Sequence, residues 1–336
     1  MRVFLTGGTG LIGRGIIQRL IERGDQAVVV TRKADQFRRR RDMRSVTVVQ
    51  GDPTQAGDWQ LALDGCDAVV NLAGHNLFAD RWSPEVKRRI RDSRVYSTEH
   101  VVEAIGRASQ APRVLVQASA IGYYGPHGDE ELTESSPPGT DFMAVVCREW
   151  EEAARGVESL GVRLATLRTG IVLALGEGAL GVMGPIFKMG GAAPIGGGDS
   201  LFRPGSGQQW MSWIHHDDIV GLYLFALDRD AATGPINGTA PHPVRNHEFG
   251  RALAHALWRP FLPFGPPNFV IGALLGEVAQ VVLKGQRVLP TRAQELGYTF
   301  AYPDLVPALK ELFTKKPAPA PAPRPQATAS AGHHHH

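Results

Sequence analysis

Residues 1–13 read MRVFLTGGTGLIG, and this stretch decides the fold of the chain. The apolar run Val3-Phe4-Leu5 predicts a short strand, and apolar side chains recur at helical spacing from Ile16 to Ile21. Glycines between them let the backbone turn sharply toward a pyrophosphate, and the helix N-terminus offers N–H groups to it. The arrangement predicts dinucleotide binding, with an ordinary glycine-rich turn as the alternative. Two registers fit the motif: Gly8-x-Gly10-x-x-Gly13 and Thr6-Gly7-x-x-Gly10-x-x-Gly13.

The two ends of the predicted cofactor site are separated along the chain. At the phosphates we expect residues of the turn and of the helix start, namely Gly7, Thr9, Gly10, Leu11, Ile12 and Gly13. A second strand is predicted over 26–31, and its end, about 20 residues beyond the glycines, meets the adenosine ribose in such a fold.

The residues at this ribose position are cations. An acid there would hydrogen-bond the 2′-hydroxyl of NAD, whereas a cation accommodates the 2′-phosphate of NADP. Arg32 and Lys33 follow Thr31, and no acid occurs before Asp35. The sequence therefore predicts NADP (NADPH) as the cofactor, held at this end by Thr31, Arg32 and Lys33, although a solvated loop with incidental charge is the alternative.

Strand and helix patterns alternate through the first half of the chain. Further strands are predicted over 46–49, 67–72, 113–117 and 162–167, with helices over 87–109 and 140–160. Continuous valine runs suit strands that are buried on both faces. We therefore predict an α/β fold, a Rossmann-type doubly wound parallel sheet.

Residues at other strand ends add candidates for cofactor binding. Asp52 is placed to meet an adenine amino group, with a simple turn acid as the alternative. The small-residue turn after the fourth strand would pass close to the cofactor's ribose and pyrophosphate. This turn holds Leu72, Ala73 and Gly74, and Arg168 follows the sixth strand.

The second half of the chain differs from the first half in composition and in its predicted elements. Residues 176–207 are dense in glycine and proline, which is typical of a functional loop or lid. A strand is predicted over 210–214 and a helix over 219–227, capped by Asp217 or Asp218. Further helices, predicted over 248–257, 269–283, 292–296 and 304–313, would form a smaller, mainly helical C-terminal lobe.

These patterns divide the chain into three parts. Residues 1–175 are expected to be mainly the NADP-binding Rossmann domain. Residues 176–314 would supply the lid, shared elements and a C-terminal substrate lobe, with the substrate in the cleft between the lobes. Residues 315–336, an Ala/Pro repeat that ends in histidines, are interpreted as a linker and a His tag.

Composition and charge narrow the function classes. The net charge is +3, so no overall positive potential favours a nucleic-acid partner. The arginines of 38–41 are interpreted as a solvated helix face near the cofactor phosphate, with a nucleic-acid-binding arm as the alternative. Two cysteines without close spacing suggest a reducing compartment. We expect a cytoplasmic protein without signal peptide or membrane span, a monomer or homodimer, with a small-molecule substrate. No metal is expected at 215–218, because adjacent ligands point in different directions.

The chain resembles the extended short-chain dehydrogenase/reductase superfamily. More narrowly, it is similar to its atypical "epimerase family" branch, which is NAD-dependent epimerase/dehydratase-like with its own C-terminal extension. The resemblance covers nearly all of residues 1–314 and implies an NADP-dependent oxidoreductase or epimerase-like enzyme. It rests on the glycine motif, Asn71-Leu72-Ala73-Gly74, Ser119-Ala120-Ile121-Gly122-Tyr123-Tyr124-Gly125, Arg168-Thr169-Gly170, residues 212–218, 285–290 and 297–303.

The superfamily's chemistry uses a Ser or Thr and a Tyr-x-x-x-Lys pair, in which the lysine lowers the tyrosine pKa. No tyrosine here is followed four residues later by a lysine. The helix that should carry the pair offers Phe142 or Met143 in the tyrosine slot, and Cys147 or Arg148 in the lysine slot.

An altered acid/base is therefore expected. The catalytic candidates are Ser119, Tyr123 and Tyr124, with His75 and Cys147 behind them. A tyrosine without a nearby cation has a pKa of ~10, so at neutral pH it is a poor base but can still donate a proton. Reduction of a substrate is therefore favoured over oxidation. The alternative function is an inactive NADP(H)-binding sensor or partner-binding protein.

Overall fold

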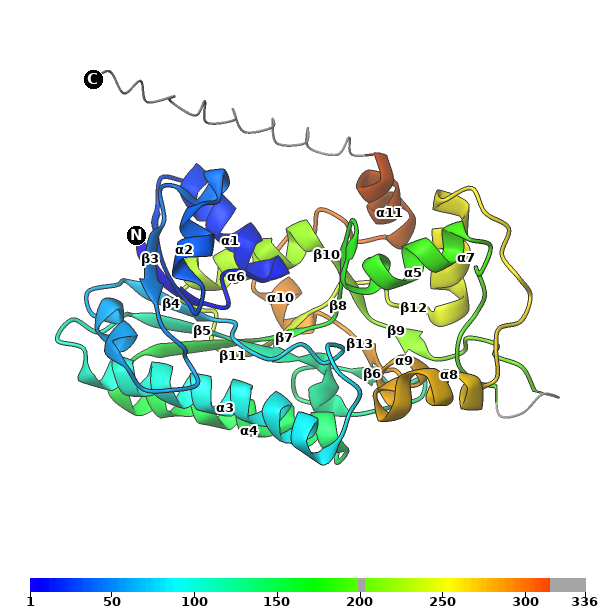
Figure 1. The fold of residues 1–336 in the computed structure, drawn as a ribbon, viewed down its shortest axis with the longest axis horizontal. Helices are drawn as coiled ribbons and strands as arrows, with labels where there is room; N and C mark the ends of the chain where they lie inside the picture. Colours follow the sequence, from blue (N-terminus) through cyan, green and yellow to red (C-terminus); the bar gives the residue numbers. More distant parts are fainter. Residues whose placement is uncertain (199–202, 315–336) are drawn as a thin grey trace, which may run out of the picture.

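The computed structural model describes residues 1–198 and 203–314, and a seven-stranded parallel sheet lies at its centre (Figure 1). The strand order is β11-β7-β5-β4-β1-β2-β3. The chain moves outward in one direction from β1 and in the other from β4, so the predicted doubly wound Rossmann fold is confirmed. The strands are β1 (Arg2–Thr6), β2 (Gln26–Thr31), β3 (Thr47–Gln50), β4 (Ala68–Asn71), β5 (Val114–Ala120), β7 (Arg163–Thr169) and β11 (Gly234–Gly238).

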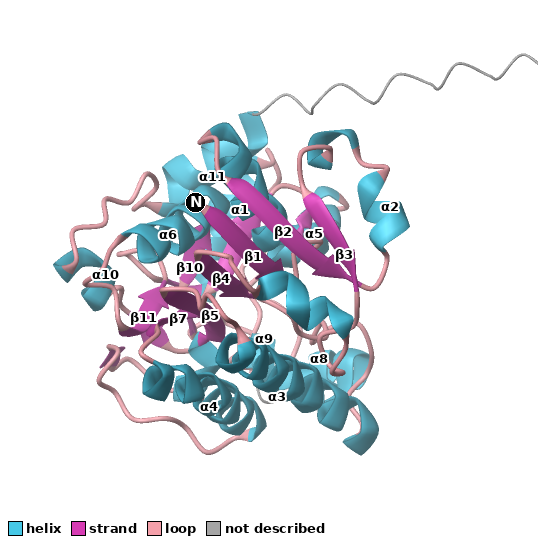
Figure 2. Cartoon of the chain, turned by 90° about the vertical axis from the view of Figure 1, so that its left-hand side faces the viewer, coloured by secondary structure: helices cyan, strands magenta, loops and turns pink. Residues whose placement is uncertain are grey.

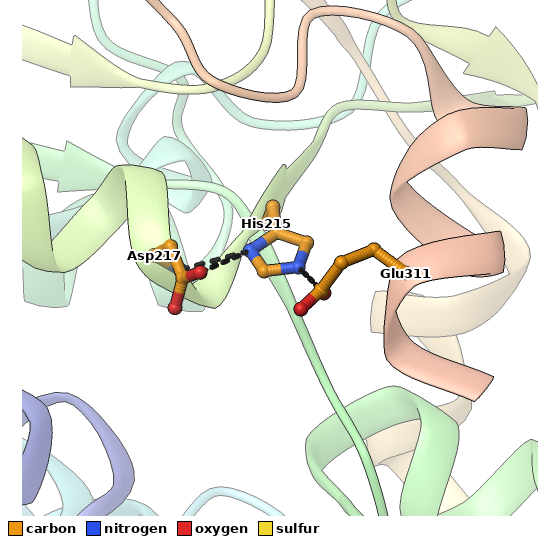
Figure 3. A group of neighbouring side chains, drawn as sticks. All are labelled: His215, Asp217 and Glu311. Atoms are coloured by element: carbon orange, nitrogen blue, oxygen red, sulfur yellow. Dashed lines mark hydrogen bonds and ion pairs between the residues drawn. The ribbon is translucent and has the colours of Figure 1, made fainter. Parts of the chain in front are cut away.

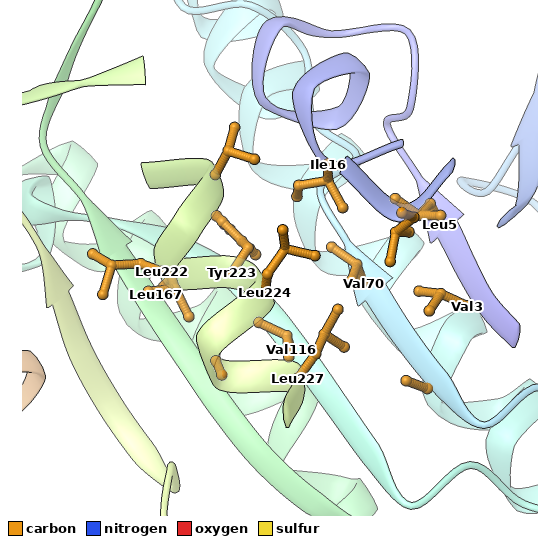
Figure 4. Close-up of a cluster of buried hydrophobic side chains, with 14 of the residues drawn as sticks. Val3, Leu5, Ile16, Val70, Val116, Leu167, Leu222, Tyr223, Leu224 and Leu227 are labelled. Carbon is orange, nitrogen blue, oxygen red and sulfur yellow. The ribbon is translucent and has the colours of Figure 1, made fainter. Parts of the chain in front are cut away.

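Helices cover both faces of this sheet (Figure 2). On one face lie α1 (Leu11–Glu22) and α6 (His216–Asp228), and on the other lie α3 (Pro84–Arg107) and α4 (Phe142–Ala154). The valine run of β2 explains the layering, because Val29 packs into the core under α1 while Val28 and Val30 pack into the core on the opposite face. Figure 4 shows the first of these cores, where strand residues such as Val70 meet Leu224 of α6.

The remaining elements build the edges and a second lobe. Short helices and 3-10 turns flank the sheet: α2 (Ala34–Arg38), η1 (Arg41–Met43), η2 (Asp58–Leu63), η3 (Ile121–Tyr124) and η4 (Arg155–Leu160). The second lobe contains α5 (Gly178–Lys188), α7 (Asn246–Ala256), α8 (Asn268–Leu275), η5 (Gly276–Val278), α9 (Ala279–Leu283) and α11 (Leu305–Thr314), whereas α10 (Thr291–Glu295) packs into the core of the sheet through Ala293. Two-stranded pairs join the parts: β10 (Trp213–His215) with β8 (Ile171–Ala174), β12 (Val244–Arg245) with β9 (Trp210–Met211), and β13 (Arg287–Val288) with β6 (Glu131–Leu132).

This lobe has a core of its own, which confirms the predicted helical C-terminal region. Phe187 of α5, Trp213 of β10, Phe249 of α7 and Leu309 of α11 are all buried in one cluster. The predicted linker and tag, 315–336, lie outside the described residues.

Several predicted elements have different bounds. The expected loop of 176–207 holds the helix α5, while 199–202 lie outside the described residues. The expected strand over 210–214 divides at Ser212 into β9 and β10, which pair with different partners. The expected helix over 269–283 divides at Gly276, whose φ of 73° ends α8.

The sheet also has one strand that the sequence patterns did not predict. The edge strand β11 contains Pro235 between glycine and isoleucine, a poor strand sequence. An edge position tolerates proline, because only one side of the strand needs its N–H groups. Pairing with β7 therefore imposes the strand against its local propensity.

Candidate functional site

The glycine turn between β1 and α1 has no room for a side chain at Gly7 or Gly13. A Cβ atom on Gly13 would lie 2.4 Å from the Gly7 carbonyl oxygen and 2.7 Å from the Gly8 Cα. A Cβ on Gly7, whose φ is +67°, would lie 2.7 Å from the carbonyl carbon of Leu72. The turn is therefore closed tightly on itself and packed against the loop that follows β4.

A buried hydroxyl joins these two loops. Thr6 at the end of β1 donates from Oγ1 to Asn71 Oδ1 at 2.5 Å, and accepts from the N–H groups of Leu72 and Ala73 at 3.0 and 3.1 Å. Asn71 in turn donates to Thr98 of α3 at 2.9 Å. The two loops at the point where the strand order reverses are thus held as one rigid unit, and ligands bind at this point in open α/β sheets.

The N-terminus of α1 opens onto the same place. Gly10 is the N-cap and has no side chain to satisfy the first-turn N–H groups. Thr9 and Gly10 are exposed, and Leu11 and Ile12 are partly exposed. Free amides and a positive dipole end fit the pyrophosphate of a dinucleotide.

The two cations at the predicted adenosine end directly follow β2. Arg32 and Lys33 are exposed, and neither forms an ion pair within residues 1–198 and 203–314. Their backbone is fixed, because Gln50 Nε2 donates to the Arg32 carbonyl at 2.6 Å and the Lys33 N–H donates to Thr31 Oγ1 at 3.2 Å. Arg38 differs, since it pairs with Asp35 at 3.2 Å.

The side chain of Asp52 forms a local contact. Its Oδ1 accepts from the Thr54 N–H at 3.0 Å and from the Thr54 hydroxyl at 2.7 Å. This geometry supports a role as turn acid, and the contact with adenine stays a prediction.

Three of the predicted site residues form a buried network at the ends of β5 and β7. Ser119, Tyr124 and Arg168 are 3%, 0% and 4% exposed. Their common partner is Glu151 of α4, which accepts from Ser119 Oγ at 2.9 Å and from Arg168 Nη2 at 2.9 Å. Arg168 also donates to the Tyr124 hydroxyl at 3.0 Å, and that hydroxyl donates to Asn237 at 2.6 Å.

The members of this network are engaged with one another, and their predicted roles in catalysis and cofactor binding stay predictions. Burial raises the pKa of Tyr124 to about 12, despite the opposing effect of Arg168, so this hydroxyl is neutral and engaged within the protein. Ser119 donates to Glu151, and Arg168 donates to Glu151 and to the Tyr124 hydroxyl. These contacts also hold the turn that carries Tyr123.

Tyr123 lies differently from its neighbour. It is half-buried, the Arg168 guanidinium carbon lies 3.5 Å from its ring centroid, and its ring meets that of Tyr124 edge-on at 5.3 Å. Its hydroxyl forms no hydrogen bond with any residue that the structure describes. Of the three catalytic candidates, Tyr123 is the one with a hydroxyl left for a substrate.

The helix α4 brings no cation to this place. Met143 and Cys147 occupy its buried face, and burial raises the pKa of the Cys147 thiol to about 12, which rules it out as a base at neutral pH. Arg148 is exposed on another face. His75 is the other candidate placed behind Ser119, Tyr123 and Tyr124. Its Nε2 lies 3.4 Å from Asp80 Oδ2.

The histidine and the acids that follow β9 form hydrogen bonds within the protein (Figure 3). His215, Asp217 and Glu311 bring possible ligand atoms within 4.8 Å of one another. However, His215 Nδ1 accepts from the Asp217 N–H at 2.9 Å, and its Nε2 bonds Glu311 at 2.6 Å. His215 is thus the N-cap of α6, in place of the predicted Asp217 or Asp218, and the buried Asp218 accepts from the N–H groups of Ala301 and Tyr302.

Sequence reasoning missed Glu151, although a signal was present. Its neighbours Cys147, Trp150 and Ala154 form the buried face of α4, and Glu151 lies four residues after Cys147 on that face. An acid among core positions is seldom buried without a partner. Its partner Arg168 was already a candidate from the sequence, as a cofactor-binding residue.

The chain matches two family models. Residues 3–237 match the one described as NAD dependent epimerase/dehydratase family, and residues 266–312 match one described as a domain of unknown function, DUF1731. Within residues 1–198 and 203–314, no helix is both long and apolar enough to cross a membrane.

Known proteins resemble the chain along most of its length. The epimerase family protein SDR39U1 homolog, chloroplastic, of Arabidopsis thaliana is 43% identical over 93% of this chain and 86% of its own. The epimerase family protein YfhF of Bacillus subtilis is 34% identical over 94% of this chain and 99% of its own. A crystal structure of human epimerase family protein SDR39U1 (isoform 2) with NADPH has a TM-score of 0.79 and 34% identity, over 93% of this chain and 99% of that one.

Proposed function

Because the chain belongs to the NAD dependent epimerase/dehydratase family, we propose that it is an NADPH-dependent oxidoreductase or epimerase-like enzyme that acts on a small carbonyl substrate. The family membership confirms the resemblance drawn from the sequence motifs. When bound, NADPH would supply the hydride, and residues of this chain would orient it and serve the substrate oxygen. A cytoplasmic location, and a monomer or homodimer, remain part of the proposal.

One observation carries the proposal. The glycine turn and the loop after β4 are locked together by Thr6 at the point where the strand order reverses, next to an uncapped helix N-terminus. These are the features that bind a pyrophosphate. The human relative solved with NADPH supports the phosphorylated form of the cofactor.

Arg32 would bind the 2′-phosphate of NADPH. We expect Arg32→Ala to weaken NADPH binding by about 10- to 100-fold, because a charge-assisted hydrogen bond contributes about 1.5–3 kcal/mol. NADH lacks the phosphate, so its affinity should change little. Titration calorimetry with both cofactors measures the difference.

The matched control is Arg107→Ala, which removes the same charge from an exposed arginine near the C-terminal end of α3, where it pairs with Glu103. It should leave both affinities within about twofold of the unmodified protein, since screened surface charges contribute little. Equal affinities of the Arg32 variant and the unmodified protein for NADPH would reject the assignment of this residue.

Tyr123 would donate the proton to the substrate oxygen during reduction. With a carbonyl compound found by screening, we expect Tyr123→Phe to slow single-turnover oxidation of NADPH by about 10²- to 10⁴-fold. NADPH affinity should stay the same, because the change removes only the hydroxyl. Stopped-flow absorbance of the nicotinamide follows the reaction, and an unchanged rate would remove Tyr123 from the mechanism.

An inactive NADPH-binding protein is the second candidate. It is favoured by the buried Met143 and Cys147 in the slots where the superfamily's tyrosine and lysine would be. This candidate predicts tight NADPH binding without turnover on a broad panel of carbonyl compounds and nucleotide sugars. If a compound is turned over and Tyr123→Phe slows that turnover, the protein is an enzyme and this second candidate is rejected.

A further inference from the structure

A half-buried arginine lies beneath the loop that follows β4. Arg94 of α3 donates from Nη1 to the carbonyl oxygens of His75 at 2.9 Å and Ile90 at 3.1 Å. Its guanidinium carbon lies 5.1 Å from the ring of Trp150 on α4. On its other side is Gly74, where an added Cβ would come within 3.1 Å of the same carbon. Backbone and indole together fix the position of the cation.

Among the described residues, the charge of Arg94 meets carbonyl oxygens and an indole ring. Within residues 1–198 and 203–314, no carboxylate forms an ion pair with it, and its buried Nε has no hydrogen-bond partner. Burial lowers the pKa of this guanidinium, because desolvation disfavours the charged form. The neighbouring arginines differ, since Arg91 pairs with Glu149 at 2.6 Å and Arg168 with Glu151 at 2.9 Å. A half-buried cation without a carboxylate partner leaves donors for a ligand with acceptor oxygens.

The position of Arg94 identifies that ligand. The loop that it contacts, Leu72 to His75, is the one that Thr6 joins to the glycine turn, so the cation lies next to the loops predicted to bind the cofactor. The contact with Trp150 places Arg94 beside α4, three residues beyond Cys147, the position that supplies no cation. Arg32, by contrast, follows β2 at the adenosine end.

We propose that Arg94 binds the nicotinamide half of NADPH, donating hydrogen bonds from its guanidinium to oxygen atoms of the nicotinamide ribose phosphate. The assignment rests on the proposed function. A cation held between Gly74 and Trp150 would fix the nicotinamide ring against movement, and it would provide the positive charge that α4 lacks. The chain thus takes its active-site cation from α3.

The test compares two ligands that share the adenosine end. NADPH carries both halves, whereas 2′,5′-ADP carries only the adenosine half with its 2′-phosphate. We expect Arg94→Met to weaken NADPH binding at least about tenfold in titration calorimetry, since it removes a charge-assisted contact. Binding of 2′,5′-ADP should stay within twofold, and Arg94→Lys should lie between the unmodified protein and the methionine variant for NADPH.

Arg91→Met is the matched control, because it removes a cation from the same helix at a surface ion pair. It should change neither affinity. If Arg94→Met does not fold, as judged by its melting curve, Arg94→Lys alone carries the comparison. Unchanged NADPH affinity in a folded Arg94 variant, or an equal loss of both ligands, would overturn the role of Arg94 while leaving the proposed function intact. Failure of the unmodified protein to bind either ligand would instead reject the proposed function.

Discussion

Glu151→Ala is expected to lower the free energy of unfolding by about 3–5 kcal/mol, because it leaves the Arg168 guanidinium buried without its anion. Arg168 is 4% exposed and meets Glu151 at 2.9 Å, and Ser119 loses its acceptor in the same variant. Glu151 raises the pKa of Arg168, against the opposing effect of burial, which agrees with a strong mutual dependence of the two side chains. Urea denaturation followed by circular dichroism measures the effect.

The control for this variant lies two residues away on the same helix. Glu149→Ala breaks the ion pair with Arg91, where both side chains are more than a third exposed. Solvent screens that pair, so its loss should cost under about 1 kcal/mol. Equal unfolding midpoints for the two variants would contradict the assigned network.

Gly13→Ala is expected to weaken NADPH binding by at least about 100-fold, because displacement of binding groups by about 1 Å can cost that much. The new Cβ would lie 2.4 Å from the Gly7 carbonyl oxygen and 2.7 Å from the Gly8 Cα, so the turn has to open. Titration calorimetry gives the affinity, and a melting curve checks that the chain still folds.

Gly184→Ala provides the comparison, since nothing lies within 4 Å of the position its Cβ would take on helix α5. This variant should bind NADPH like the unmodified protein. A Gly13→Ala variant that keeps its full affinity would show that the turn does not contact the pyrophosphate.

The fold could be predicted where local pattern and tertiary structure agree. The valine run of β2 predicted a strand buried on both faces, and it was found over the same residues, Gln26–Thr31. The glycine turn was identified because a strand precedes it and helical spacing follows it. The strand β11 was missed, since Gly234 and Pro235 give it a sequence typical of a turn.

The site was predicted less completely, because burial cannot be read from a motif. Ser119, Tyr123 and Tyr124 stand in one short stretch of sequence, yet among the described contacts only the Tyr123 hydroxyl forms no hydrogen bond. Arg94 was not singled out, although it continues the buried face of α3 four residues after Ile90. A charged residue on the apolar face of a helix was the available signal.

Calorimetric titration of the unmodified chain with NADPH and NADH tests the central claim most directly. We predict heat of binding for NADPH at one site per chain, with an affinity at least about tenfold above that for NADH, since only NADPH carries the phosphate for Arg32. The absence of heat with reduced and oxidised nicotinamide dinucleotides alike would contradict the account.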